Sequence, residues 1–64
     1  MTNLQQAMER EGITSRELAE KAEVSYNLIG LLRTGKHTNP SLKTARAISR
    51  VLDTTIDTLW PEGE

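Results

Sequence analysis

The sequence contains no cysteine and no phenylalanine, and it has one histidine, one tryptophan and one tyrosine. Without cysteine the chain can form neither a disulfide nor a thiolate zinc site, a composition that favours a reducing compartment. Its apolar runs never approach the ~20 residues that a membrane-spanning helix needs, and the first ten residues lack the apolar stretch of a signal peptide. We therefore expect a cytoplasmic protein that does not enter a membrane.

The short length excludes further functions. A chain of 64 residues makes one small domain, here 1–64, and buries only about 60% of its unfolded surface, which leaves no room for a deep enzyme pocket. One histidine without cysteine cannot supply a metal cluster, and there is no glycine-rich phosphate loop. Ser25, His37 and Asp53 have the residue types of a catalytic triad, but nothing indicates the pocket that a triad needs. We expect no enzyme activity, no cofactor, no metal and no small-molecule substrate.

The net charge of −1 is unlike that of a typical nucleic-acid-binding domain, which is basic. The charges are, however, unevenly distributed. Residues 1–32 carry three bases and five acids, residues 33–50 carry five bases and no acid, and residues 51–64 carry four acids and no base. Arg33, Lys36 and Lys43 flank a loop, where a phosphate-facing role is favoured. Arg46 and Arg50 fit equally well as the solvated face of a helix.

Residues 14–35 predict two short helices joined by a tight corner. Thr14 can cap the first and Glu17 completes a capping box, while Ser25 can cap the second and Gly35 can end it. Each helix has one apolar stripe at helical spacing: Leu18, Ala19 and Ala22, then Ile29 and Leu32. Val24 should fill the corner. Helices this short are marginal alone, so the rest of the chain must brace them while the second projects. That arrangement is a helix-turn-helix, about 15–33, whose second helix enters the DNA major groove.

The rest of the chain predicts three more helices. They span 2–11, roughly 42–52 and a short stretch after Thr55, and 61–64 is expected to be a frayed tail. Asp53, where the chain must turn, tolerates the left-handed region. The inward residues of the three helices are expected to be Leu4, Ala7 and Met8, then Leu42, Ala45, Ile48 and Leu52, and finally Ile56, Leu59 and Trp60. No segment alternates like a strand, so the predicted fold class is all-α, with five helices in one domain.

Several short motifs occur together at fixed spacing: Ile13-Thr14, Glu17-Leu18-Ala19, Val24-Ser25, Ile29, Gly35-Lys36, Pro40-Ser41-Leu42 and the run from Leu52 to Leu59. Through them the chain resembles the Cro/C1-type (XRE) helix-turn-helix family of bacterial and phage repressors along nearly its whole length. The joint spacing is far more specific than any single motif. The resemblance implies a compact five-helix, lambda-repressor-like DNA-binding domain that regulates transcription, usually as a dimer on a palindromic operator.

Three positions depart from the family pattern. The family usually has glycine at the corner, where this chain has Glu23, and a left-handed glutamate costs about 1–2 kcal/mol. Ser15 stands where the family often has a phosphate-binding glutamine. Met8 and Arg33 stand where many members pair an arginine with a glutamate. Because both members of that pair are changed, no buried charge is left alone, and we expect Met8 to pack under the stem of Arg33.

The outward face of the second motif helix should read DNA bases. With Ser25 as its cap, this face carries Tyr26, Asn27, Gly30 and Leu31. The amide of Asn27 can donate to N7 and accept from N6 of an adenine, and Leu31 can contact a thymine methyl group. Two residues have structural alternatives: Gly30 can accommodate a neighbouring helix, and Leu31 can be partly buried against one.

A second set of residues should contact phosphates, which position a protein on DNA without reading its sequence. They lie at helix starts or in and around the loop after Gly35, where N–H groups and cations favour phosphate oxygens: Ser15, Ser25, Arg33, Lys36, His37, Asn39, Ser41 and Lys43. His37 fits an ordinary exposed loop histidine better than a special role. Trp60 fits a lid on the core or a subunit contact better than a platform for stacked bases.

Together these residues predict a sequence-specific double-stranded DNA-binding domain that acts as a transcriptional regulator, a repressor, on an operator. A homodimer on two half-sites about 34 Å apart would supply the affinity that one small domain lacks. The alternatives are a helical protein-interaction module, which the acidic net charge favours, and an antitoxin-like regulator that uses the same fold.

Overall fold

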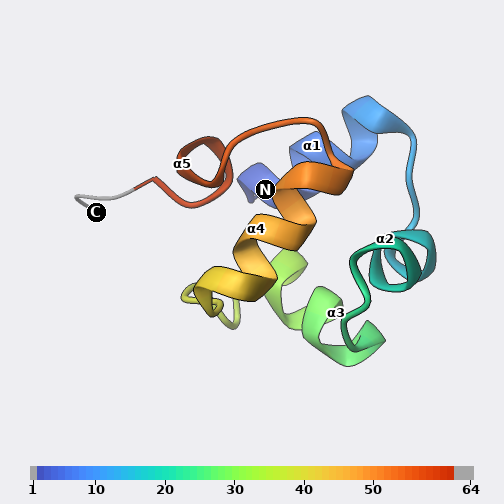
Figure 1. Cartoon of the computed structure of the whole chain (residues 1–64), viewed down its shortest axis with the longest axis horizontal. Helices are drawn as coiled ribbons and strands as arrows, with labels where there is room; N and C mark the ends of the chain where they lie inside the picture. The colour runs from blue at the N-terminus through green and yellow to red at the C-terminus, as the bar shows by residue number, and fades with distance from the viewer. Residues whose placement is uncertain (1, 62–64) are drawn as a thin grey trace.

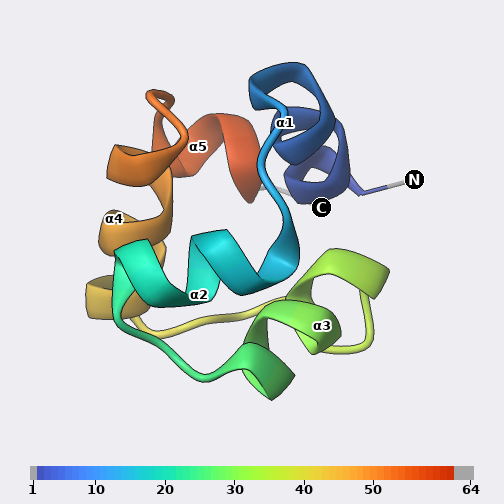
Figure 2. The ribbon, with the colours of Figure 1, turned by 90° about the vertical axis from the view of Figure 1, so that its right-hand side faces the viewer.

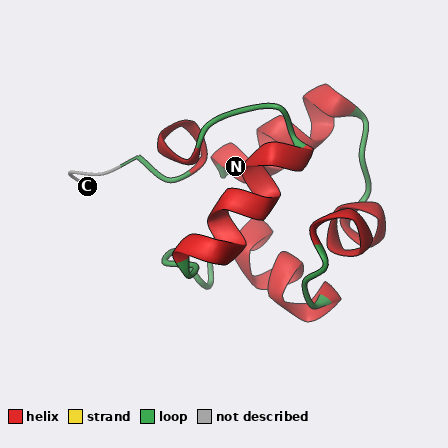
Figure 3. Ribbon diagram, viewed as in Figure 1, coloured by secondary structure: helices red, strands yellow, loops and turns green. Residues whose placement is uncertain are grey.

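The computed structural model describes residues 2–61, and these form five helices and no strand (Figures 1 and 3). The helices are α1 (Asn3–Glu11), α2 (Ser15–Ala22), α3 (Tyr26–Thr34), α4 (Leu42–Val51) and α5 (Ile56–Leu59). The predicted all-α class is confirmed. The helices expected at 2–11 and 42–52 are each one residue shorter, because Thr2 and Leu52 serve as caps. Of the predicted tail, 61–64, only Pro61 lies within the described residues, and it is exposed.

Every helix begins after a hydroxyl side chain. The residue before each helix accepts a hydrogen bond from the backbone N–H three positions on, as it does at Thr2, Thr14, Ser25, Ser41 and Thr55. Each of these bonds satisfies a backbone donor that has no partner inside its helix. At the start of α2 the Glu17 carboxylate accepts in return from the Thr14 N–H at 3.0 Å, so the predicted capping box is confirmed.

The first three helices each end in a residue with the left-handed conformation. Gly12 after α1 has φ 67°, Glu23 after α2 has φ 59° and Gly35 after α3 has φ 86°. Asp53, one residue beyond the cap of α4, has φ 54°. Glu23 and Asp53 are the two left-handed residues that are not glycine, and both lie where the sequence predicted that the chain turns.

The helices form two pairs linked by α4. In Figure 2, α2 and α3 lie below α1 and α5, and α4 runs along the side from the first pair to the second. Two hydrogen bonds tie the start of α1 to distant segments: Thr2 Oγ1 donates to the Arg33 carbonyl at 2.7 Å, and Asn3 Nδ2 donates to the Thr58 carbonyl at 3.1 Å. The first of these bonds joins the last turn of α3 to the start of α1.

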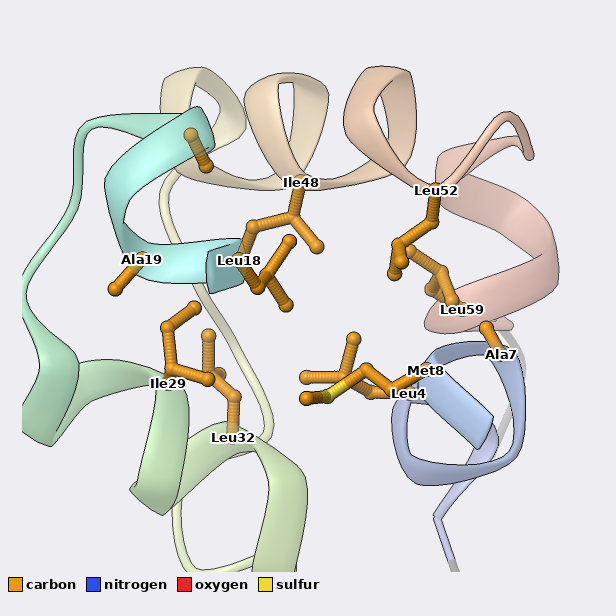
Figure 4. Packing of buried hydrophobic residues seen from close by; sticks show 11 residues of the cluster. Leu4, Ala7, Met8, Leu18, Ala19, Ile29, Leu32, Ile48, Leu52 and Leu59 are labelled. Atoms are coloured by element: carbon orange, nitrogen blue, oxygen red, sulfur yellow. The ribbon is translucent and has the colours of Figure 1, made fainter. Parts of the chain in front are cut away.

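The core fills the space between these pairs (Figure 4). All five helices contribute to it, and its largest fully buried side chains are Leu4, Leu18, Ile29, Leu32, Ile48 and Leu52. Burial of a side chain of this size contributes roughly 1.5–3 kcal/mol, which is how short helices that are marginal alone become stable together. Trp60 packs, partly buried, against this core. In the described part of the chain, no helix is both long and apolar enough to cross a membrane.

Two predicted core residues are not in the core. Ile56, expected on the inner side of the last helix, is half-buried and does not belong to the core cluster. Leu42 was expected on the inner stripe of its helix, but it is 64% exposed. Ala45, Ile48 and Leu52 are buried and define the inward direction of α4. At 3.6 residues per turn Leu42 lies about 85° away from that direction, and it stands in the first turn, at the edge of the packed region. The prediction for Leu42 was therefore wrong.

Candidate nucleic-acid interface

Helix α3 turns one face to the core and the other to solvent. Ile29 and Leu32 are buried, as their spacing predicted, whereas Tyr26 is 58% and Leu31 43% exposed. Asn27 is exposed beside Tyr26 in the first turn. Leu31 therefore lies on the solvent side of the helix with part of its surface covered, so both interpretations of Leu31 fit this position. The predicted outward face of this helix is the observed one.

Gly30 lies in the middle of this outward face. A Cβ atom placed on Gly30 would meet nothing within 4 Å. No neighbouring helix is therefore close enough to require a glycine, and the interpretation of Gly30 as a packing accommodation is wrong. Glycine in a helix interior costs about 1 kcal/mol relative to alanine, so this open position lowers the stability of α3 without any packing benefit inside the molecule.

The corner between α2 and α3 sets the direction of the outward face. The Val24 N–H donates to the Ala19 carbonyl at 3.0 Å, and the Glu23 N–H donates to the Glu20 carbonyl at 3.3 Å. Val24 is partly buried against the core, as predicted. With the corner closed by these bonds and filled by Val24, α3 lies beneath α2, and its first turn stands at the lower edge of the molecule (Figure 2).

Arg16, which was not among the residues predicted from the sequence, lies beside the outward face of α3. Its guanidinium carbon stands 5.9 Å from the centre of the Tyr26 ring, within the range of a cation–π contact. Both side chains are exposed, so a cation from the first turn of α2 is held at the first turn of α3. Only the angle between the helices brings these two residues together, and their spacing in the sequence carries no signal of it.

Cations border α3 on its other end. Lys36 and Asn39 are exposed in the loop that follows α3, and Ser41 and Lys43 are exposed at the start of α4. Among residues 2–61 the one ion pair within 4 Å joins Arg10 to Glu11. The cations at Lys36 and Lys43 are thus not neutralised by a carboxylate of the described chain, and they remain free to meet an anionic ligand.

Two serines of the set, Ser25 and Ser41, also cap helices, and His37 lines a groove away from them. The Ser41 hydroxyl caps α4, accepting from the Thr44 N–H at 3.2 Å, so its own capacity for a phosphate is partly used. His37 lines a groove with Leu59 and Trp60, and its backbone N–H donates to the Leu31 carbonyl at 3.1 Å. His37 is exposed, and no partner for its side chain is seen among the described residues, which fits an ordinary loop histidine.

Ser15 and Arg33 bind each other. Arg33 Nη1 donates to Ser15 Oγ at 2.7 Å, and Arg33 Nε donates to Gln5 Oε1. Ser15 is only 8% exposed. Both residues were expected to contact phosphates, but the structure gives each a partner inside the molecule. Met8, expected to pack under the Arg33 stem, is buried and lines the same groove as Arg33.

Comparison with known proteins agrees with this geometry. A family model described as "Helix-turn-helix" matches residues 4–59. The HTH-type transcriptional regulator SinR of Bacillus subtilis (strain 168) is 34% identical over 59 residues, which cover 92% of this chain and 53% of the relative. SinR of Bacillus licheniformis is 34% identical over 61 residues, covering 95% of this chain and 55% of the relative. The chain thus spans about half the length of these curated relatives. No solved structure matches it.

Proposed function

The chain belongs to the Cro/C1-type (XRE) helix-turn-helix family, and we propose on that basis that it binds a double-stranded DNA operator in the cytoplasm and acts there as a transcriptional repressor. The observation that carries the proposal is the outward face of α3, where Tyr26, Asn27 and Leu31 stand exposed beside unpaired cations. The two SinR proteins are named as transcriptional regulators.

The reading face has the chemistry of the major groove. The Asn27 side chain carries a donor and an acceptor at the spacing of N7 and N6 of adenine. Leu31, one turn further on, offers an apolar surface to a thymine methyl group, and Tyr26 offers a hydroxyl to a base edge or a phosphate. Gly30, between them, lets the helix backbone come close to the DNA. Base readout is therefore assigned to these four residues.

The phosphate contacts are assigned to exposed groups at the borders of α3. The set consists of Ser25, Lys36, Asn39, Ser41 and Lys43, with Arg16 added because it lies beside Tyr26. The starts of α3 and α4 add backbone N–H groups that favour phosphate oxygens. The net charge of −1 does not oppose this assignment, because residues 33–50 hold five bases and no acid, and the acids lie in the segments on either side.

The first experiment is selection of bound duplexes from a random-sequence library, followed by titration of the selected duplex at increasing salt. Each phosphate that the protein neutralises contributes about −0.9 to the slope of log affinity against log salt. Two to four contacts per protomer would give a slope between about −2 and −4. Lys36→Met and Lys43→Met should each make the slope less steep by about 0.9.

Two results would reject DNA binding as the function. One is a library from which no duplex is enriched, and the other is an affinity that does not change with salt. Either outcome would favour the alternative, a protein-interaction module or an antitoxin-like regulator built on the same five helices. Arg50→Met is the matched control, because Arg50 lies near the far end of α4, and its loss should leave the slope nearly unchanged.

A further inference from the structure

Arg33, in the last turn of α3, makes three hydrogen bonds to other parts of the fold. Its backbone carbonyl accepts from Thr2 Oγ1 at 2.7 Å. Its guanidinium donates through Nε to Gln5 Oε1 and through Nη1, at 2.7 Å, to Ser15 Oγ. Thr2 and Gln5 belong to the cap and the first turn of α1, and Ser15 is the first residue of α2. One residue thus joins the end of α3 to the starts of two other helices.

The geometry points to Arg33 as a positioning residue that fixes the orientation of the reading helix, and not as a ligand of a DNA phosphate. The core contacts of Ile29 and Leu32 hold α3 against the molecule, but hydrophobic burial is not directional and leaves rotation and sliding weakly restrained. A guanidinium is planar and rigid, with donors in a fixed fork. Two partners on two different helices therefore define the direction of α3 in a way that apolar packing does not.

Because Arg33 lies far from Asn27 along α3, a small change in the orientation of the helix moves Asn27 by a large distance. Asn27 lies six residues before Arg33, which is about 9 Å along the helix axis at 1.5 Å per residue. A tilt of about 10° at the Arg33 end would move Asn27 by roughly 1.5 Å, about half the length of the hydrogen bonds that read a base. Phosphate contacts from long, flexible lysines tolerate such a shift far better. Loss of the Arg33 contacts should therefore reduce discrimination between sequences more than it reduces general affinity.

This inference rests on the proposed function, and its test uses the selected duplex and a scrambled duplex of equal length. The variants are Arg33→Lys, which keeps the charge but loses the fork, and the double variant Gln5→Met with Ser15→Ala, which keeps Arg33 but removes its side-chain partners. Both should lower the ratio of specific to non-specific affinity by about tenfold, equivalent to about 1.4 kcal/mol. The salt slope should stay unchanged in both.

Two controls separate orientation from charge and from stability. Lys36→Met should make the salt slope less steep by about 0.9 and leave the specificity ratio unchanged. Val51→Ala, half-buried in α4 and remote from α3, should lower the melting temperature without changing the ratio. A purely structural role for Arg33 would make its variants behave like Val51→Ala at matched loss of melting temperature.

The outcomes are distinct. If Arg33→Lys retains the full specificity ratio, or if the double variant binds the selected duplex as well as the original chain does, Arg33 is not a positioning residue and the inference is overturned. The inference then fails while the proposed function stands, since the unaltered chain still binds its selected duplex. If the unaltered chain enriches no duplex, the proposed function fails first and the inference fails with it.

Discussion

At the scale of the residue, Glu23 carries the clearest local strain in the described chain. Its φ of 59° lies in the left-handed region, which costs a non-glycine residue about 1–2 kcal/mol. Glycine adopts this conformation without a Cβ clash but loses more entropy on folding. Glu23→Gly should therefore raise the free energy of unfolding by about 1 kcal/mol, measured by urea denaturation.

The matched control for this change is Glu20→Gly. Glu20 is an exposed glutamate in the same helix, with helical backbone, so glycine there should lower the free energy of unfolding by about 1 kcal/mol. We therefore expect the free energy of unfolding to rise with Glu23→Gly and to fall with Glu20→Gly. Equal signs would mean that the corner does not hold a left-handed residue.

Asn27 is the residue whose replacement should affect sequence reading most directly. Asn27→Ala removes one donor and one acceptor from an exposed position, so the fold should keep its stability. The loss on the selected duplex should be about 1–3 kcal/mol, with little change on unrelated duplexes. Fluorescence anisotropy with both duplexes measures it. Equal loss on both would show that Asn27 contacts the backbone of the DNA and not its bases.

At the scale of the element, the capping box gives α2 a measurable dependence on pH. The pKa of Glu17 lies below its ordinary value of 4.5, chiefly because its carboxylate accepts the Thr14 backbone N–H, with further contributions from the Thr14 hydroxyl and Lys21. A carboxylate with a lowered pKa stabilises the folded state above the ordinary value. That stabilisation is lost as the pH falls from about 4.5 through the folded pKa.

Glu17→Gln should remove this dependence, because glutamine occupies the same position without titrating. The stability difference between the original chain and Glu17→Gln is therefore expected to be largest near neutral pH and to shrink through that acidic window. Urea denaturation at several pH values measures the difference, and Glu20→Gln is the control for the loss of one negative charge. A difference that stays constant with pH would contradict the capping box as its source.

Replacement of Gly30 tests whether the middle of α3 comes close to the DNA. Gly30→Ala should raise the free energy of unfolding by about 1 kcal/mol, because alanine favours helix and the added methyl group meets nothing within 4 Å. On DNA the same methyl group would stand between the helix and the bases, so affinity for the selected duplex should fall while stability rises. Unchanged affinity would show that the DNA does not come close at this point.

At the scale of the whole molecule, the dimensions allow two copies to bind one face of a duplex. The protomer measures 30 × 21 × 19 Å, and half-sites one helical turn apart are separated by about 34 Å. The extents of one copy are thus no larger than the separation of the half-sites. Since one small domain offers few contacts, we propose that the operator is bound by a homodimer, in which the second contact adds to the first through effective concentration.

Spacing tests the dimer. Insertion of about five base pairs between the half-sites of the selected duplex turns one of them to the opposite face, since a helical turn takes about 10–10.5 base pairs. Affinity should then fall by about a hundredfold or more, towards that of a single half-site. Insertion of a full helical turn should bring both half-sites back to the same face of the duplex, and it is the control for the added length. A protein that tolerates every spacing equally would be binding as independent monomers.

The sequence by itself determined the helices, their ends and the outward face of α3. Cap residues act on N–H groups three positions away, as Thr14 and Glu17 do on each other, and apolar stripes repeat every three or four residues. Both kinds of signal lie within a single turn or two, so they can be read along the chain. Tyr26, Asn27, Gly30 and Leu31 were found in this way, by their place relative to the Ser25 cap.

Only the tertiary structure decided which distant residues meet. Arg33 binds partners 28 and 18 residues away, and Arg16 stands over Tyr26 because the corner turns α3 towards it. Leu42 is exposed because the angle of α4 on the core leaves its first turn uncovered. Such contacts depend on the angles and the register at which helices pack. A hydrophobic stripe shows which face of a helix is buried, but it does not show which other helix covers that face, because hydrophobic burial is not directional.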